Sequence, residues 1–138
     1  MSRFVYFVAT SLSFSLGFFL YLAIETVYKR HFSSSNTHWT MGLLAGLAFV
    51  FLLYLDRSAL GFFQKALLGA VFITLGELAF GIYLNLYRRL AIWDYSRLPF
   101  HFLGQICPLF SLIWLLLCCF VIPINRFLLL EVEFLTNS

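Results

Sequence analysis

Long apolar stretches alternate along the chain with short polar clusters. A helix needs roughly 20 apolar residues to cross a membrane, and the stretches are close to that length or longer. The pattern predicts four transmembrane helices, at about residues 4–28, 38–55, 66–87 and 104–124. A short polar loop is expected at residues 33–36. Because the number of spans is even, both termini are expected on one side of the membrane.

The remaining residues complete a single membrane domain over residues 1–138. Residues 127–135 carry Glu131 and Glu133 among apolar positions, which predicts an amphipathic segment. This segment either extends the fourth helix or lies at the membrane interface. Pro123, with the polar residues just after it, is expected to end the fourth span. The first stretch is too long for a signal peptide and lacks a small-x-small cleavage site, so we expect a retained helix.

Composition supports a membrane protein. Hydrophobic residues make up 62% of the chain and charged residues 11%, whereas a soluble domain carries about 25% charged residues. The strand-length alternation of an outer-membrane barrel is missing. We therefore predict an all-α integral membrane protein, a compact bundle of four transmembrane helices. The net charge of +3 suits anchoring to anionic lipid and gives no case for nucleic-acid binding.

An acidic residue lies deep within the third stretch. Glu77, in "TLGELAFG", would cost about 3 kcal/mol at the centre of a membrane helix. It should therefore be protonated, paired or turned towards a polar cavity. Thr74, Glu77, Gly81 and Asn85 are spaced by three, four and four residues, so they share one helical face. That face predicts a close protein contact or a polar ligand.

The other stretches offer matching faces. Cys107, Ser111, Trp114 and Cys118 form a stripe on the fourth stretch, and a G-x-x-x-G motif on the second favours close helix packing. A bundle with Glu77 near its centre is expected. The glycines predicted to allow close packing are Gly42, Gly46, Gly76, Gly81 and Gly104.

The segment "WDYSRLPFHFLGQICP" (93–108) joins the third and fourth stretches. Asp94 can start a turn by bonding backbone amides, and His101 and Gln105 lie among apolar residues. The pattern predicts a polar loop or a short re-entrant segment that brings Asn85, His101 and Gln105 towards Glu77. An ordinary interfacial loop with an aromatic belt is the alternative.

The three cysteines, Cys107, Cys118 and Cys119, show no zinc-ligand spacing. They are interpreted as small apolar core residues. We expect no metal and no cofactor.

At these residues the chain resembles the family named Putative ABC-transporter type IV, which comprises small multi-pass bacterial membrane proteins. One position departs from the family pattern, since His101 stands where an Asn is usual, and a His can titrate. The resemblance implies a bacterial cytoplasmic membrane and a polar cluster that forms one unit with Glu77. The chain has no Walker motif for nucleotide hydrolysis. The matching residues are Gly76, Glu77, Gly81, Asn85, Trp93, Asp94, Tyr95, Ser96, Pro99, Gly104, Cys107, Ser111 and Trp114.

Three functional hypotheses follow. In the first, the protein binds or moves a polar or cationic small molecule or a lipid head group at Glu77. In the second, it is a structural or regulatory membrane subunit without a ligand of its own. In the third, it is an intramembrane enzyme with Glu77, Asp94 or His101 as acid or base, although a nucleophile motif is missing. Membrane lipid, further copies of the chain or a partner membrane subunit are the expected partners. The predicted ligand-binding residues are Glu77, Asn85, Trp93, Asp94, Tyr95, His101, Gln105, Ser111 and Trp114.

Overall fold

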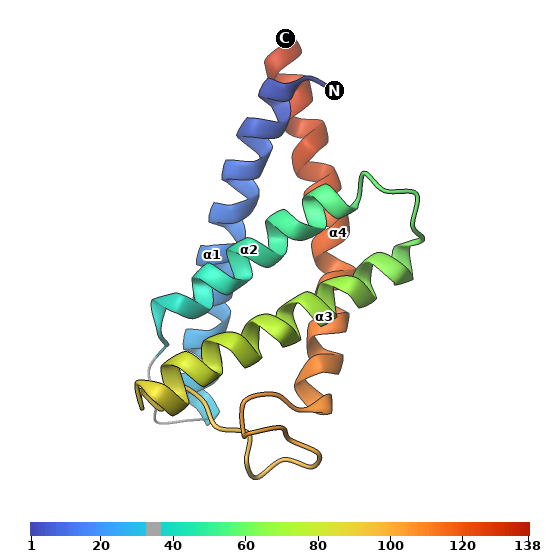
Figure 1. The fold of residues 1–138 in the computed structure, drawn as a ribbon. Coiled ribbons are helices and arrows are strands. Elements are labelled where there is room, and N and C mark those ends of the chain that lie inside the picture. The colour runs from blue at the N-terminus through green and yellow to red at the C-terminus, as the bar shows by residue number, and fades with distance from the viewer. Residues whose placement is uncertain (33–36) are drawn as a thin grey trace.

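A computed structural model describes residues 1–32 and 37–138 (Figure 1). Over these residues the chain forms four α-helices and one π-helical segment, η1, without a β-strand. The prediction of an all-α fold is therefore confirmed, while the polar loop predicted at residues 33–36 lies outside the described residues. The elements are α1 (Arg3–Phe32), α2 (Trp39–Leu55), α3 (Phe62–Gly81), η1 (Ile82–Tyr87) and α4 (Pro108–Asn137).

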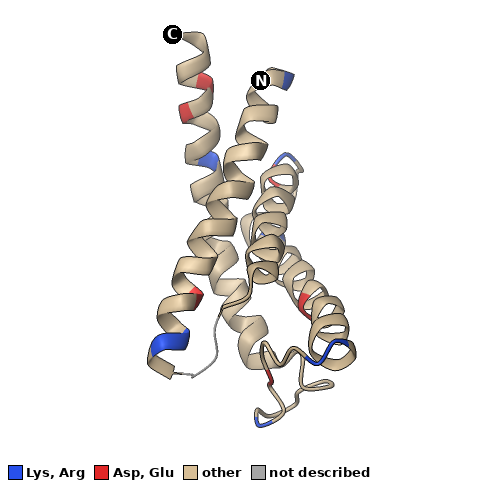
Figure 2. Ribbon diagram, turned by 90° about the vertical axis from the view of Figure 1, so that its left-hand side faces the viewer, with Lys and Arg blue, Asp and Glu red and all other residues tan. Residues whose placement is uncertain are grey.

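Three helical segments of the described chain are long and apolar enough to cross a membrane: Arg3–Phe32, Phe62–Tyr87 and Pro108–Asn137. The remaining helix, α2, is also apolar but has only 17 residues. At 1.5 Å per residue it is about 26 Å long, close to the roughly 30 Å thickness of a hydrocarbon core. Charged residues gather towards the ends of the bundle, and long middle portions of the helices carry none (Figure 2).

Two helix pairs make up the bundle. The most extensive contacts are those of α1 with α2 and of α3 with α4. The two pairs are joined because α2 also contacts α3 and α4, and α4 also contacts α1. Both termini lie at one end of the bundle, and the α3–α4 loop (residues 88–107) lies at the other (Figure 1). The core between the pairs includes Leu52, Ala66, Cys118 and Ile122, all fully buried.

The fourth helix differs from the prediction at both ends. It begins at Pro108 rather than near residue 104, and it continues through Pro123 to Asn137. Pro123 lies inside the helix, so the α-helix does not stop where the predicted span does. The polar residues after it do not stop the helix: Asn125 bonds to Ser13 of α1, and Arg126 bonds to Asp56 in the α2–α3 turn. The amphipathic segment predicted at 127–135 is the last part of the same helix.

A buried polar contact joins three helices. Asn125 is 1% exposed. Its Oδ1 accepts a hydrogen bond from Ser13 Oγ at 2.7 Å, and its Nδ2 donates to the carbonyl oxygen of Phe49 at 2.9 Å. Because a buried amide without partners costs free energy, these bonds fix how α4 meets α1 and α2.

The glycines on the helices allow close approach. Gly42 and Gly46 of α2 face α1, and Gly76 of α3 faces Leu44 of α2. Gly81 packs against Gln105 of the loop. Gly104 lies in the loop, outside α4, with a φ of +70°. This left-handed conformation suits glycine, so its role differs from the predicted helix packing.

An ion-pair cluster closes the end of the bundle at the α2–α3 turn. Asp56 Oδ2 accepts from Arg126 Nε at 2.7 Å, and Oδ1 accepts from Arg126 Nη2 and from Lys65 Nζ, each at 2.8 Å. The hydrogen bonds from Arg126, followed by those from Lys65, hold the pKa of Asp56 below its usual value of 3.8. The cluster ties the turn to α4.

We predict that Gly46→Ala destabilises the protein by about 1–3 kcal/mol, the usual cost of overpacking a tight contact. A Cβ at this position would lie 2.7 Å from the ring of Phe14 and 3.0 Å from the Phe14 carbonyl oxygen. Thermal unfolding of the detergent-purified protein measures the loss. Gly61→Ala is the control, since its Cβ would meet only Gln64 Oε1, at an ordinary 3.7 Å, and it should lose only the smaller contribution of glycine as the N-cap residue of α3. Equal melting temperatures for both variants would contradict the tight α1–α2 contact.

We predict that Asp56→Asn lowers stability by about 1–2 kcal/mol near neutral pH, because it removes charge-assisted hydrogen bonds. The folded-state pKa of Asp56 lies below 3.8. The stabilisation is therefore complete above about pH 4 and disappears as the pH falls through the folded-state pKa. Melting temperatures of the wild type and the variant, measured from pH 7 to pH 3, should converge only at the acidic end. A constant difference across this range would exclude the ionised Asp56 as its source.

Candidate functional site

Glu77 lies on the inner face of α3 and is 4% exposed. Its Oε1 accepts a hydrogen bond from Trp114 Nε1 of α4 at 2.6 Å. Its Oε2 accepts from the Tyr95 hydroxyl of the α3–α4 loop at 2.8 Å. A buried carboxyl group needs such donors, and here two parts of the chain supply them.

The two donors belong to a continuous row of aromatic rings. The Tyr95 ring stacks on Phe110 with centroids 4.5 Å apart, and Phe110 lies 6.0 Å from Trp114. Trp114 in turn lies 6.1 Å from Tyr21 of α1. Burial, together with the nearby Glu77, raises the pKa of the Tyr95 phenol far above its usual value. Tyr95 therefore keeps its proton at any physiological pH and remains a donor.

The backbone that carries Tyr95 is unusual. The helix of α3 widens into the π-helical segment η1, a feature often found near functional sites. Four non-glycine residues adopt positive φ angles: Arg89, Ala91, Phe100 and Leu103, at 50° to 57°. Each such residue costs about 1–2 kcal/mol, so the loop keeps this shape only because other contacts hold it.

Side chains of η1 and the loop provide those contacts. Asn85 donates to Gln105 Oε1 at 2.8 Å and accepts from the Ile92 amide at 2.7 Å. Trp93 Nε1 donates to the Gln105 carbonyl oxygen at 3.0 Å. Together they brace the loop against the end of α3, and Tyr95 projects from this brace to Glu77.

A pair of charged residues on α1 ties the loop to a third helix. Lys29 Nζ lies 3.0 Å from Glu25 Oε1 and donates to the Ile92 carbonyl oxygen at 3.1 Å. Both side chains are largely buried. Glu25 Oε2 is buried without a hydrogen-bond partner among the described residues. Glu25 was not among the residues predicted from the sequence, although a Glu four residues before a Lys on a helix is a pairing signal.

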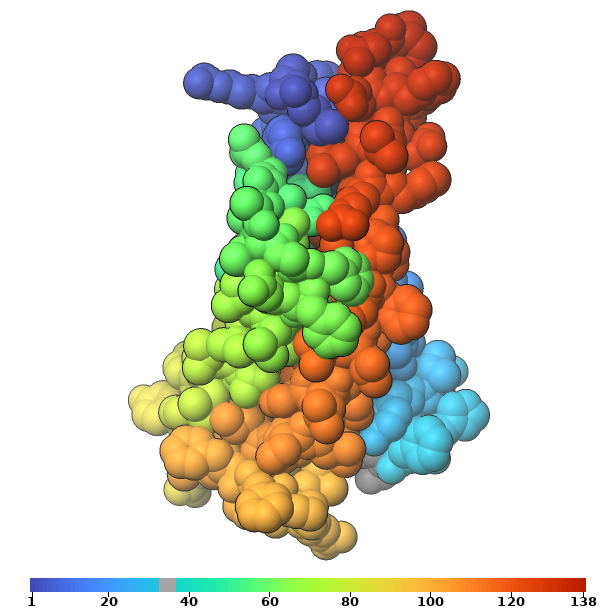
Figure 3. Space-filling view, turned by 90° about the vertical axis from the view of Figure 1, so that its right-hand side faces the viewer, coloured from blue at the N-terminus to red at the C-terminus, as the bar shows by residue number. Residues whose placement is uncertain are grey.

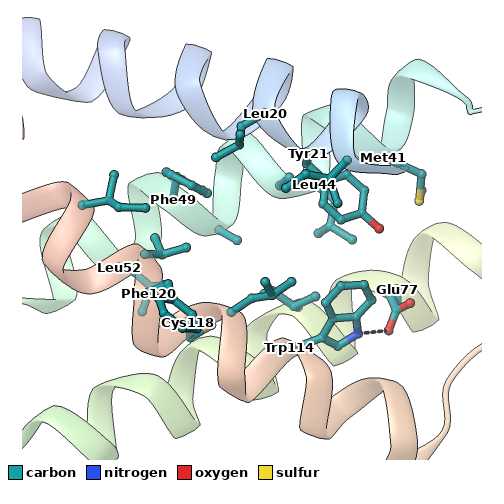
Figure 4. A pocket seen from close by; sticks show the side chains of 17 residues that line it. Leu20, Tyr21, Met41, Leu44, Phe49, Leu52, Glu77, Trp114, Cys118 and Phe120 are labelled. Atoms are coloured by element: carbon teal, nitrogen blue, oxygen red, sulfur yellow. Dashed lines mark hydrogen bonds between the residues drawn. The ribbon is translucent and has the colours of Figure 1, made fainter. Parts of the chain in front are cut away.

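An apolar cavity of about 220 Å³ opens next to Glu77, between the four helices (Figure 4). Glu77 and Trp114 lie at one end, and Leu52 and Phe120 lie towards the other. Among the described residues that line it, Glu77 is the one charged side chain. The lining residues are Leu20, Tyr21, Ile24, Met41, Leu44, Ala45, Ala48, Phe49, Leu52, Ile73, Glu77, Trp114, Leu117, Cys118, Phe120, Val121 and Ile124.

The sequence predicted Glu77 near the centre of the bundle. In the structure Glu77 lies closer to one end of the bundle than to its centre. Its partner Trp114 is the seventh residue of α4, which places it about 9 Å from the start of that helix. Met41, which also lines the cavity, is the third residue of α2. The carboxyl end of the cavity thus lies near the loop, and the apolar part extends from there along the bundle.

The structure brings together only part of the predicted ligand-binding set. Glu77 and Trp114 line the cavity, and Tyr95 contacts Glu77. The Ser111 hydroxyl lies 2.8 Å from that of Thr74, between α3 and α4. The brace residues Asn85, Trp93 and Gln105 support the loop but do not line the cavity.

Asp94 and His101 are exposed on the loop and do not line the cavity. Asp94 Oδ1 accepts from the Ser96 amide at 2.9 Å, and this bond lowers the pKa of Asp94. His101 Nδ1 accepts from the Gly104 amide at 3.0 Å. Both side chains therefore shape turns. Within the described part of the chain, no group of three His, Cys, Asp or Glu residues could hold a metal ion.

Comparisons with known proteins give one family. No curated protein and no solved structure matches the chain. The family described as Putative ABC-transporter type IV matches residues 5–137. The match includes α1 and α2, where the resemblance in the sequence rests mainly on hydropathy. With three helices able to cross a membrane, this indicates a membrane protein of transporter type. The chain belongs to the Putative ABC-transporter type IV family.

Proposed function

We propose that this protein binds an amphiphilic, lipid-like molecule inside the membrane. Its polar or cationic head group would meet Glu77, and its apolar chain would lie in the cavity between the helices. The observation that carries the proposal is the cavity itself, whose walls are apolar except at the buried carboxyl end. Most ligand sites combine such an apolar lining with a few polar groups that orient the ligand.

The proposal places all four helices across the bilayer, with the shorter α2 spanning alongside the three long ones. Large apolar side chains on the outer faces support this placement, for example Phe7 and Phe19, which are 70% and 68% exposed. Both termini would then lie on one side (Figure 1). A bacterial cytoplasmic membrane stays a prediction from the sequence.

The direction of the cavity favours an amphiphile over a small polar solute. Glu77 lies near the loop end of the bundle, and the apolar part of the cavity extends from there towards Leu52 and Phe120. A lipid in a bilayer has the same arrangement, with its head at the interface and its chain directed to the centre. A small polar solute would satisfy Glu77 but would leave the apolar walls without a complementary surface.

The chemistry of the carboxyl end selects the head group. Each oxygen of Glu77 accepts one hydrogen bond from the protein and can accept another. The other acid near this end, Glu25, is paired with Lys29, so the carboxyl group that meets a ligand is that of Glu77. An amine or a hydroxyl can donate to this region, whereas a carboxylate or phosphate would be repelled.

A route into the cavity is available from the lipid. Four lining residues also expose a third or more of their surface: Leu20 and Ile24 on α1, and Leu117 and Phe120 on α4. They mark the place where the cavity meets the outer surface, between α1 and α4. A chain entering sideways from the bilayer would cross only apolar residues there.

One observation favours the alternative of a structural or regulatory subunit. Both oxygens of Glu77 have protein donors, as a residue used only for packing would require. Packing alone, however, gives no reason for a cavity beside the acid. The enzymatic alternative draws less support, because Asp94 and His101 are exposed and shape turns.

We predict that the purified protein binds dodecylamine more tightly than dodecanol, and dodecanol more tightly than dodecanoate. In Glu77→Gln the affinity for the amine should fall about tenfold, since a charge-assisted hydrogen bond contributes about 1.5–3 kcal/mol. Native mass spectrometry of the protein released from detergent measures the affinities for the three dodecyl compounds in the wild type and in the variant. Glu131→Gln, an exposed acid on α4, is the matched control. An unchanged amine affinity in Glu77→Gln would favour the structural subunit.

We predict that Ala45→Leu weakens binding of all three dodecyl probes by about tenfold or more, because the larger side chain occupies the volume needed by the chain. Ala45 lines the cavity, whereas Ala79 is exposed on α3. Ala79→Leu is therefore the control and should bind like the wild type. Equal binding by both variants would place the alkyl chains elsewhere on the protein.

A further inference from the structure

We propose a second ligand site at the opposite end of the bundle, a phosphate-binding site for the head group of an anionic lipid. A cleft of about 330 Å³ lies where the start of α1 meets the end of α2. Figure 3 shows this N-terminal region at one end of the molecule and the α3–α4 loop at the other. The cleft shares no lining residue with the Glu77 cavity. The lining residues are Met1, Arg3, Tyr6, Phe7, Thr10, Tyr54 and Arg57.

The walls of this cleft are held by contacts between α1 and α2. The rings of Tyr6 and Tyr54 lie 5.8 Å apart, and the hydroxyls of Tyr54 and Thr10 are 2.7 Å apart. The guanidinium of Arg57 lies over the Tyr6 ring, 4.6 Å from its centroid. A guanidinium stacked on a ring leaves its N–H edge available for hydrogen bonds. Arg57 is thus already positioned before any ligand binds.

The positive charge of the cleft is not neutralised by the protein. The cleft contains two arginines and no acidic residue. Asp56, next to Arg57 in the chain, already accepts hydrogen bonds from Lys65 and Arg126 on both of its oxygens. Among the described residues, neither Arg3 nor Arg57 forms an ion pair.

These features fit a phosphate group at a membrane surface. Two guanidinium groups can bind phosphate oxygens with paired hydrogen bonds, and tyrosines are common at the level of the lipid head groups. The exposed apolar side chains of Met1 and Phe7, 59% and 70% exposed, border the cleft and would meet the acyl chains. Inorganic phosphate shares the charged part of this chemistry but not the apolar part.

The test uses the full-length protein in detergent and measures lipid binding by native mass spectrometry. The probes are phosphatidylglycerol, phosphatidylcholine with the same acyl chains, and inorganic phosphate. In the double variant Arg3→Gln/Arg57→Gln, the affinity for phosphatidylglycerol should fall about tenfold or more. Phosphatidylcholine carries the same phosphate but its choline cancels the net charge, so it should bind more weakly to the wild type and lose less affinity in the variant. Both arginines are exposed, so the melting temperature should fall only slightly, by the loss of the Arg57–Tyr6 cation–π contact.

Two further variants separate a built site from general charge attraction. Arg30→Gln/Arg88→Gln removes the same charge from exposed positions elsewhere and should bind phosphatidylglycerol like the wild type. Arg3→Lys/Arg57→Lys keeps the charge but loses the paired N–H groups, so it should bind several-fold more weakly. An equal loss in the Arg30/Arg88 variant, or full affinity in the Gln or the Lys variant at positions 3 and 57, would overturn the proposal.

Competition with inorganic phosphate shows whether the ligand of the cleft is a lipid or soluble phosphate. If millimolar inorganic phosphate leaves phosphatidylglycerol bound, the site takes a lipid, as proposed. If phosphate displaces the lipid, and if phosphate binding also requires Arg3 and Arg57, the assignment to a lipid is wrong. The cleft is then a site for soluble phosphate. Neither result bears on the Glu77 cavity, which is tested with different probes and different variants.

Discussion

The structure depends on how a single carboxyl group is buried among apolar side chains. Glu77 cannot be left without donors in such surroundings, and its own helix supplies none. The donors are Trp114, which fixes the rotation of α4 against α3, and Tyr95, which fixes where the α3–α4 loop docks. A hydrogen-bonding requirement at one residue therefore sets the arrangement of two helices and of the chain that joins them.

The α3–α4 loop adopts a strained backbone in this arrangement. Four non-glycine residues have left-handed backbone conformations, and α3 ends in a π-helical segment. Strain of this kind persists only where surrounding contacts over-determine the backbone. Here the contacts come from Asn85 and Gln105 on one side and from Lys29 of α1 on the other. Because Tyr95 of this loop donates to the acid beside the cavity, the loop is a part of the site and not a mere connection.

The sequence predicts those structural features best that the residues of a single helix define. Hydropathy gives the four helices, and the 3.6-residue period places Glu77 and Trp114 on inward faces. The continuation of α4 was predicted only as one of two alternatives, because Asn125 and Arg126 resemble a solvated stop while their partners lie more than 60 residues away in the chain. A cavity at Glu77 was expected only as a polar one, and its apolar extension was not predicted, since unfilled volume between helices belongs to no single stretch of sequence. Asp94 and His101 were predicted to bind a ligand from their residue types and their positions in the family pattern; the structure places both outside the cavity, in turns that local hydrogen bonds shape.

The two ends of the proposed cavity differ in what they can contribute to recognition. Within a bilayer, an alkyl chain already lies among apolar neighbours, so its transfer into an apolar cavity provides little hydrophobic driving force. The walls lined by Leu44, Leu52 and Phe120 therefore limit the size of the chain more than they add affinity. Discrimination between amphiphiles must come from the head group, where a hydrogen bond to Glu77 forms in low dielectric and is correspondingly strong. The position of the acid, at the interface end of an otherwise apolar space, is therefore the feature that decides which molecule can bind.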